Sequence, residues 1–471
     1  MNARVLCLTG AVVLASALGC RGKADPAPSP ASSAPPPPPS APAAKESLAD
    51  SGAQSAAGAS DACPAIDAAK LAKFTCKSPI VDVPVPALVD PKATLAPFYE
   101  KIAELARGRA KRHVRIAMYG DSNLTADAET GRLRRQLQGR FGDGGHGFVA
   151  LAQPWAWYSH NDVHHDGTWK HPKVRQLATS NLRIVDGHYG FANIASECGA
   201  EGCAAWVSTD PQKGSPIGWT ASSFDLYYLK RPDGGRFDIT LDGKIVKSID
   251  SKAEKFEAAF ERVDAPDAHH ELKVLIHGHG TVRLFGVVLD REPPSIQVDS
   301  LGTGSLNLEQ LTQVKNDSRR AQLEHRPYDL VIIALGTNVF QNDADNHKNA
   351  KYFVERLREA VPGVPVLFFS PPDSTDSAEE HATKTDPRIK QLVKAFRVMA
   401  EENDAAYWDY HAAMGGNESV FSWVEKGLVE HDRYHLTKQG HEIMADRFLC
   451  ALWDGVTAHV DTHAGAGCAP R

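Results

Sequence analysis

The chain has 471 residues, of which 42% are hydrophobic and 23% charged, as is typical of a globular protein with a sizeable core. Its formal net charge is -6, so it lacks the basic surplus that nucleic-acid binding requires, and no nucleic-acid partner is expected. The length is too great for one ordinary domain, even once the low-complexity tail is removed.

The first residues have the pattern of a targeting signal. Arg4 precedes an apolar run over 5–18 that is too short to span a bilayer. The run ends in Ala-Leu-Gly-Cys20, which resembles a bacterial lipobox, although that family prefers leucine where this chain has the alanine. The resemblance implies a lipoprotein signal peptide over 1–20 and lipidation of Cys20. Because Arg21 follows, it also implies the outer membrane, facing the periplasm. A cleaved secretory signal with an incidental cysteine is the alternative.

A low-complexity stretch follows the signal. Residues 21–62 are mostly Pro, Ala and Ser and cannot bury a core, so we predict a disordered linker. About 40 residues at ~3.1 Å each would extend roughly 100 Å from the membrane. Residues 63–110 form an N-terminal segment in which Phe98, Ile102 and Leu105 have helical spacing.

Six cysteines remain once Cys7 and Cys20 are set aside with the signal. An even number predicts disulfides and an oxidising compartment. No Cys-x-x-Cys occurs, so a zinc site is disfavoured, and we predict no metal and no cofactor. Proximity in sequence suggests the pairs Cys63/Cys76, Cys198/Cys203 and Cys450/Cys468, with connectivity left open.

The stretch from Val114 to Asn123 organises the rest of the chain. Its apolar residues alternate up to Gly120, as in a buried strand that ends in a tight turn, and a helical pattern follows. Ser122 therefore lies at the carboxyl end of a strand, where α/β folds place their chemistry. The glycine-rich run at 141–148 lacks the features of a phosphate loop and is expected to be a turn near the site.

Residues 153–293 differ in character from their surroundings. Tryptophans cluster in them, and short alternating runs are separated by glycine-containing hairpin turns. This pattern predicts a β-sandwich inserted between 111–152 and 294–455, the two parts of an α/β domain. Residues 456–471 are expected to be a C-terminal tail. After the insert, strands are predicted at 295–301, 329–335, 364–369 and 405–409, and helices at 306–323, 348–360, 389–403 and from Thr437.

Three residues, one at a strand tip and two in the loop before the last helix, suit ester hydrolysis through an acyl-enzyme. Ser122 would be the nucleophile and His435 the base that takes its proton. Asp432 lies three residues earlier on the same loop and would hold the imidazole in the required tautomer. We therefore predict Ser122, Asp432 and His435 as the catalytic residues.

An oxyanion hole can be predicted from the other strand tips. The amides of Ser122 and of either Gly302 or Gly304 would donate to the oxyanion, as would the side chain of Asn338. The two glycines are one residue apart, so the sequence leaves open which of them donates.

With these residues the chain resembles the SGNH (GDSL) hydrolase superfamily. That family is named for Ser, Gly, Asn and His in four sequence blocks. They occur here in the same order, as Ser122, either Gly302 or Gly304, Asn338 and His435. Asn123 stands where many members have leucine. The resemblance implies a flavodoxin-like, three-layer α/β/α domain. The β insert and the Phe141-Gly-Asp-Gly-Gly run are similar to periplasmic peptidoglycan O-acetylesterases of Gram-negative bacteria, which carry a jelly-roll-like insert. That similarity implies hydrolysis of acetyl esters on an O-acetylated envelope polysaccharide, with peptidoglycan favoured.

Other functions stay open. A periplasmic O-acetyltransferase would use the same triad with a different acceptor. A non-catalytic polysaccharide-binding lipoprotein would keep the fold, and a lipase would need an exposed apolar entrance that the sequence does not show. His160, His164 and His165 could bind a metal, but their surroundings do not predict a helix.

Overall fold

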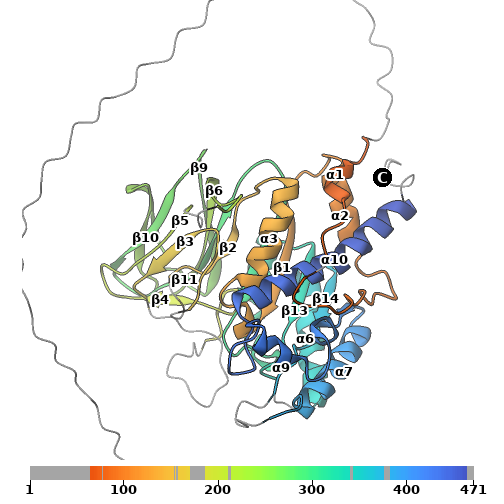
Figure 1. The fold of residues 1–471 in the computed structure, drawn as a ribbon. Coiled ribbons are helices and arrows are strands. Elements are labelled where there is room, and N and C mark those ends of the chain that lie inside the picture. The colour runs from red at the N-terminus through yellow and green to blue at the C-terminus, as the bar shows by residue number, and fades with distance from the viewer. Residues whose placement is uncertain are drawn as a thin grey trace, which may run out of the picture. The chain divides into compact units, whose positions relative to one another are not determined.

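The structure, a computed structural model, separates residues 1–61 from 62–471 as two units (Figure 1). The predictions for the signal, Cys20 and the linker lie outside the described residues. In the described part, no helix combines the length and apolarity needed to cross a bilayer. The described residues are 64–76, 78–152, 154, 157–169, 186–209, 214–339, 343–375 and 382–463.

A parallel five-stranded sheet forms the centre of the α/β domain, in the order β12-β1-β13-β14-β15. Renumbered within this domain the order is 2-1-3-4-5, which is the flavodoxin-like arrangement, so the predicted fold class is confirmed. The strands are β1 (Val114–Gly120), β12 (Ile296–Gly302), β13 (Leu330–Ala334), β14 (Val366–Phe369) and β15 (Ala406–Trp408).

Helices cover both faces of this sheet because the side chains of each strand alternate between two apolar cores. In β1, Ile116 and Met118 pack into one core and Ala117 and Tyr119 into the other. The first core contains α2 (Ala96–Ala106), α3 (Ala128–Phe141), α8 (Tyr410–Met414), α9 (Ser419–Glu425) and α10 (Lys438–His463). The second contains α4 (Leu308–Leu311), α5 (Asn316–His325), α6 (Asp343–Ala360) and α7 (Pro387–Glu402).

The insert is a sandwich of two antiparallel sheets, β3-β5-β10-β7-β8 and β2-β11-β6-β9, with β4 paired to β11. A core of side chains from both sheets lies between them. The strands are β2 (Gly147–Val149), β3 (His164–Gly167), β4 (Ser196–Cys198), β5 (Ala204–Ser208), β6 (Ala221–Lys230), β7 (Arg236–Leu241), β8 (Lys244–Asp250), β9 (Glu257–Ala268), β10 (Glu271–Gly278) and β11 (Val282–Asp290).

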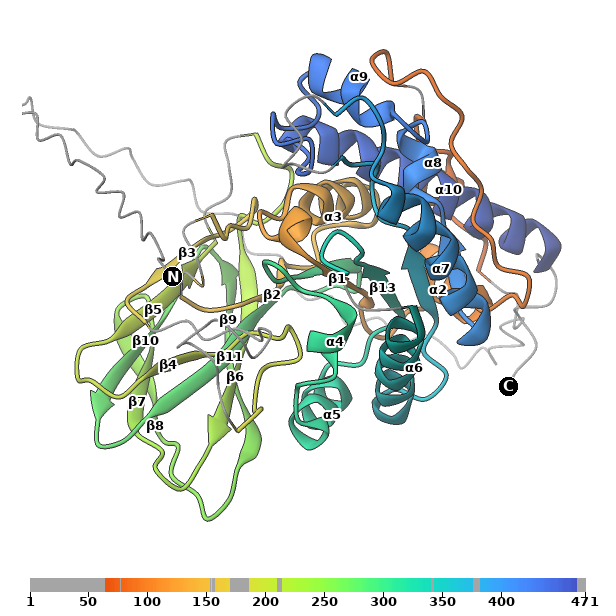
Figure 2. The ribbon, with the colours of Figure 1, turned by 90° about the horizontal axis from the view of Figure 1, so that it is seen from below.

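The second sheet of the sandwich also packs against the α/β domain (Figure 2). Along β6, Leu226 and Tyr228 face the sandwich core, whereas Tyr227 and Leu229 face the α/β domain. This period of two is that of a strand buried on both sides. The two domains therefore share a continuous apolar interface.

Three predicted boundaries were wrong. The sandwich begins before residue 153, because β2 at Gly147–Val149 pairs with β11. The helix expected over 306–323 is two helices, α4 and α5, separated by a turn that buries Val314. Residues 456–463 belong to α10, which buries Val456 and Val460, so the tail does not start at 456.

Two disulfides join described cysteines. Cys198 bonds to Cys203 in the sandwich, as their proximity suggested. Cys76, however, bonds to Cys450, 374 residues away, and thus ties the N-terminal segment to α10. The suggested pairs Cys63/Cys76 and Cys450/Cys468 are therefore wrong, because local spacing carries no information on which helix the segment packs against. Cys63 and Cys468 themselves lie outside the described residues.

Candidate active site

Ser122 occupies a tight turn at the carboxyl end of β1. The turn is a single 3-10 turn over Ser122–Leu124, in which the Asp121 carboxylate accepts a hydrogen bond from the amide of Asn123. Leu124 packs so closely beneath it that a Cβ on Gly302 would lie 2.7 Å from the Leu124 backbone. The close approach of the Leu124 backbone thus requires glycine at position 302. Ser122 itself is partly exposed.

His435 lies against Ser122 although 313 residues separate them. The Nε2 atom of His435 is 2.8 Å from Ser122 Oγ, and its Nδ1 is 2.7 Å from Asp432 Oδ2. The backbone amides of Tyr434 and His435 donate to Asp432 Oδ1 at 2.9 and 3.0 Å, which fixes the carboxylate. The structure therefore brings the three predicted catalytic residues together in the order that acyl transfer needs.

The charge of Asp432 is favoured by these contacts. Partial burial would raise the pKa of this carboxyl, but hydrogen bonds from the His435 ring and from the two amides outweigh it and hold the pKa below the usual value. Asp432 is thus a carboxylate that accepts from the imidazole. Both side chains are exposed to solvent by about two fifths, so the site is open on this side.

Asn338 supplies a donor that is not used by any group in the described part of the chain. Gly336 turns the chain after β13 with a φ of 137°, a conformation that strongly favours glycine. Asn338 follows two residues later, and its Nδ2 atom is buried without a hydrogen-bond partner. A buried unpaired amide is costly unless a ligand completes it, as an oxyanion would.

The two glycine candidates lie on the same sheet edge. Gly302 is the last residue of β12 and stands opposite Gly120 in the parallel ladder. Gly304 lies in the turn beyond the strand and is buried. Gly302 and Gly304 therefore lie at the carboxyl end of β12, the strand that pairs with the Ser122-bearing strand β1.

Three contacts that the sequence analysis missed connect the loops of the site. The side-chain oxygen of Asn123 accepts from the amide of Leu436 at 3.1 Å, so the nucleophile turn holds the histidine loop. The Tyr434 hydroxyl donates to the carbonyl of Thr337, the residue before Asn338. Thr337 in turn donates its hydroxyl to the Asp121 carboxylate. Such side-chain contacts between distant loops leave no periodic signal in a sequence.

Burial sets the protonation of this network. It raises the pKa of Tyr434 to about 12, so the phenol stays a neutral donor. It also raises the pKa of Asp121, against hydrogen bonds from Thr337 and Asn123 that act in the other direction.

A second polar cluster lies where the sandwich meets α3. His146, His160 and Asp127 place potential metal-ligand atoms within 4.8 Å of one another. The two rings, however, hydrogen-bond to each other at 2.8 Å, and Asp127 forms a buried ion pair with Arg134. These atoms already have partners, and the adjacent guanidinium disfavours a cation. We therefore interpret the cluster as a structural contact.

The histidines that the sequence suggested as metal ligands do not gather as a set. His164 is exposed on β3, with its ring against Trp206, whereas His160 and His165 are buried. Burial lowers the pKa of His160 to about 3 and that of His165 to about 4, so both rings are neutral near pH 7.

Comparison with known proteins identifies the α/β domain. Residues 276–443 match the GDSL-like lipase/acylhydrolase family. The α/β domain is an SGNH hydrolase. The matched range contains Asn338 and His435. Ser122 lies outside this range in the sequence, and the fold brings it next to His435. As an SGNH hydrolase, the chain is a serine hydrolase of carboxylic esters.

Solved structures resemble this SGNH hydrolase to different degrees. A structure described as a peptidoglycan O-acetylesterase in action superposes with a TM-score of 0.65 at 22% identity, covering 79% of this chain and 99% of that one. A family two carbohydrate esterase from Cellvibrio japonicus, at 12% identity, covers 63% and 99%, with a TM-score of only 0.26. No curated protein matches the sequence.

Proposed function

We propose that this SGNH hydrolase is a lipid-anchored periplasmic O-acetylesterase that removes acetyl groups from an envelope polysaccharide, with O-acetylated peptidoglycan as the substrate. The observation that carries the proposal is the continuous chain of contacts from Ser122 through His435 to Asp432. The anchor and the compartment rest on the sequence around Cys20 and on the disulfides.

The reaction follows from the geometry. Ser122 Oγ attacks the acetyl carbonyl while His435 Nε2 takes its proton, and Asp432 stabilises the imidazolium that forms. The oxyanion accepts from Asn338 Nδ2 and from amides at the strand tips. The intermediate collapses when His435 returns the proton to the sugar oxygen, which leaves as an alcohol. Water then attacks the acetyl-serine with His435 as base, and acetate and free Ser122 result.

The choice of substrate has two supports. The fold likeness to a peptidoglycan O-acetylesterase covers 79% of this chain, which is more than the α/β domain alone. The site also lies in an open surface, with His435 and Asp432 about two fifths exposed. An open site suits an acetyl group carried on a polymer, which could not enter a deep pocket.

Acetate release by the full chain tests the proposal. We expect release from an aryl acetate and from O-acetylated peptidoglycan, and loss of both in Ser122→Ala with unchanged thermal unfolding. Full activity of the Ser122→Ala protein would overturn the triad. Release from the aryl ester alone would contradict the polymer assignment and favour an acetyltransferase, which would be detected as acetyl transfer to an added saccharide.

A further inference from the structure

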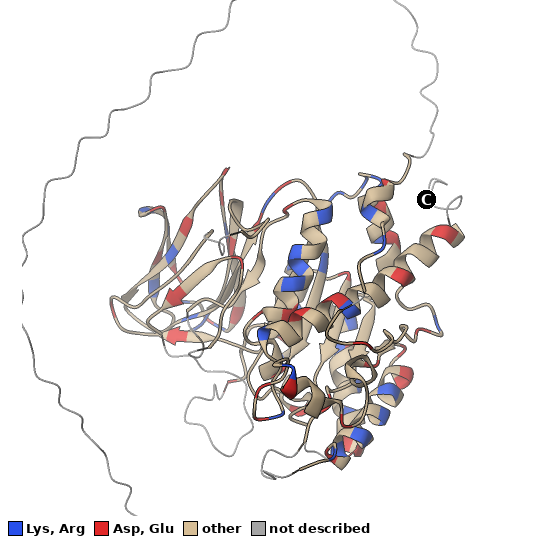
Figure 3. Cartoon of the chain, viewed as in Figure 1, with Lys and Arg blue, Asp and Glu red and all other residues tan. Residues whose placement is uncertain are grey.

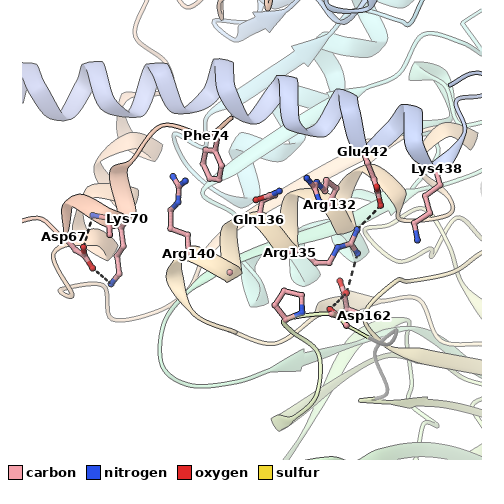
Figure 4. A pocket seen from close by; sticks show the side chains of 15 residues that line it. Asp67, Lys70, Phe74, Arg132, Arg135, Gln136, Arg140, Asp162, Lys438 and Glu442 are labelled. Carbon is pink, nitrogen blue, oxygen red and sulfur yellow. Dashed lines mark hydrogen bonds and ion pairs between the residues drawn. The ribbon is translucent and has the colours of Figure 1, made fainter. Parts of the chain in front are cut away.

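A groove along α3 is lined by many charged side chains. It has a volume of about 800 Å³, within the range of ligand sites, and lies between α3, α10, the N-terminal segment and the insert loop at 214–216 (Figure 4). Its end at Lys438 is three residues from His435 in sequence. From there it follows α3 to Arg140, and the step from position 132 to 140 spans about 12 Å of helix.

The lining of this groove has three acidic residues, Asp67, Asp162 and Glu442, and five basic ones, Lys70, Arg132, Arg135, Arg140 and Lys438. The basic residues of α3 are blue in Figure 3. Two of them are structural. Arg132 forms a bidentate pair with Asp446 of α10, and Arg135 lies 3.4–3.5 Å from Glu442 and Asp162. These contacts fasten α3 to α10 and to the insert.

The far end of the groove holds positive charge that is not neutralised. Arg140 takes part in none of the ion pairs among the described residues, and its one hydrogen bond goes to the carbonyl of Ala72. Its guanidinium is held in place by stacking at 3.5 Å from the ring centre of Phe74. Lys70 is nearby, and its ammonium is 4.0 Å from Asp67, a weak surface pair. A pre-positioned guanidinium with free donors is suited to a carboxylate.

The insert adds an aromatic surface at the rim. Trp219 is half exposed, and its indole donates to the carbonyl of Ser215, a residue of the groove wall. Ser215 itself donates to Asp162, so this loop is fixed on the α3 side. An exposed indole held this way can stack on a sugar ring.

We propose that the groove binds a glycan strand that carries carboxylate groups, with Arg140 and Lys70 holding the carboxylates and Trp219 contacting a sugar. The inference rests on the proposed function and deepens it. Peptidoglycan bears carboxylates on its peptide side chains, so the groove would select it over a neutral acetylated polymer. The acetylated sugar would lie at Ser122 and neighbouring units along α3.

Binding without turnover tests this directly. Full-length Ser122→Ala protein would be co-sedimented with insoluble peptidoglycan, before and after its carboxylates are converted to amides. We expect Lys70→Gln/Arg140→Gln to raise the apparent Kd at least five-fold in this background. Amidation of the peptidoglycan should raise the apparent Kd of the Ser122→Ala protein to the same level. It should leave the apparent Kd of the triple variant, which combines Ser122→Ala with Lys70→Gln and Arg140→Gln, unchanged. Arg320→Gln, an exposed arginine on α5 paired with Glu324, is the matched control and should bind normally.

Equal binding by the folded triple variant, or no effect of amidation, would overturn the groove assignment. If that variant fails to fold, Lys70→Glu alone is used, since this side chain is on the surface. Failure of the proposed function is distinguishable: wild type would then release no acetate from peptidoglycan while groove-dependent binding persisted.

Discussion

Asn338 is one of the residues whose buried side chain leaves a polar atom unpaired within the described part of the protein. Its Nδ2 is buried and has no hydrogen-bond partner among the described residues, whereas its backbone is fixed by the Gly336 turn and by the Tyr434 contact to Thr337. A donor held in this way needs no reorganisation when negative charge develops on the substrate. Its contribution should therefore be confined to the transition state.

Asn338→Ala is expected to lower kcat by about 10²- to 10³-fold with KM nearly unchanged, since one oxyanion donor of this type is worth about 3–4 kcal/mol. The measurement is steady-state hydrolysis of an aryl acetate, with thermal unfolding as the check on folding. A kcat within three-fold of wild type would exclude Asn338 from the oxyanion hole.

At the scale of elements, the loop between α9 and α10 has to present His435 to a serine on another strand. It is attached at both ends of the histidine: Leu436 donates to Asn123, and Tyr434 donates to Thr337. A short bridge between Val429 and Leu436 closes the loop on itself, and Thr437 caps α10 through the amide of Gly440. Tyr434 is thus a positioning residue that couples the histidine loop to the oxyanion block.

Tyr434→Phe removes that hydroxyl and is expected to lower kcat about five- to ten-fold, since a hydrogen bond of this kind is worth about 1 kcal/mol. KM and the thermal midpoint should change little, because the ring keeps its packing. Kinetics of Tyr352→Phe, a tyrosine on α6 that stacks with Arg356, provide the comparison. If both variants match wild type in kcat, Tyr434 does not position the histidine loop.

The same elements explain what the sequence could predict. A strand such as β13 is buried on both faces and appears as an apolar run, so its tip and the polar residues after it can be located. Parallel strands end on one edge, which brings Ser122 and Asn338 together. His435 follows no strand and reaches them from the loop between α9 and α10. β2 could not be assigned, because three residues, Gly147–Val149, show no period. The Cys76–Cys450 bond and the Asn123–Leu436 contact depend on packing between distant segments, which spacing does not encode.

At the scale of the whole molecule, the two domains are joined by a buried charge as well as by apolar contacts. Asp299 on β12 is fully buried and accepts from the amide of Phe148 on β2 at 2.9 Å. It also accepts from Arg326 at 2.7 Å and from the Tyr328 hydroxyl at 2.6 Å. One carboxylate of the parallel sheet thus orients the first strand of the sandwich.

This carboxylate makes stability depend on pH in a definite direction. Burial alone would raise the pKa of Asp299, but Arg326 and the hydrogen bonds from Tyr328 and Phe148 outweigh it and hold the pKa below its unfolded value. A group with a lowered folded-state pKa stabilises the fold above its unfolded pKa of about 4, and this contribution is lost as the pH falls through the folded pKa.

We therefore expect the free energy of unfolding to fall as the pH drops below about 4, with a shallower decline in Asp299→Asn. At pH 7 the variant should be about 3–5 kcal/mol less stable, because Arg326 is left buried without its partner. Denaturant unfolding between pH 3 and 7 measures both. Asp454→Asn, a carboxylate with a surface pair to Lys73, should change stability by less than about 1 kcal/mol. Both proteins keep the buried Asp127–Arg134 pair, so this pair does not contribute to a difference between them. If the free energy of unfolding changed with pH equally in Asp299→Asn and in wild type, Asp299 would not be a source of the pH dependence.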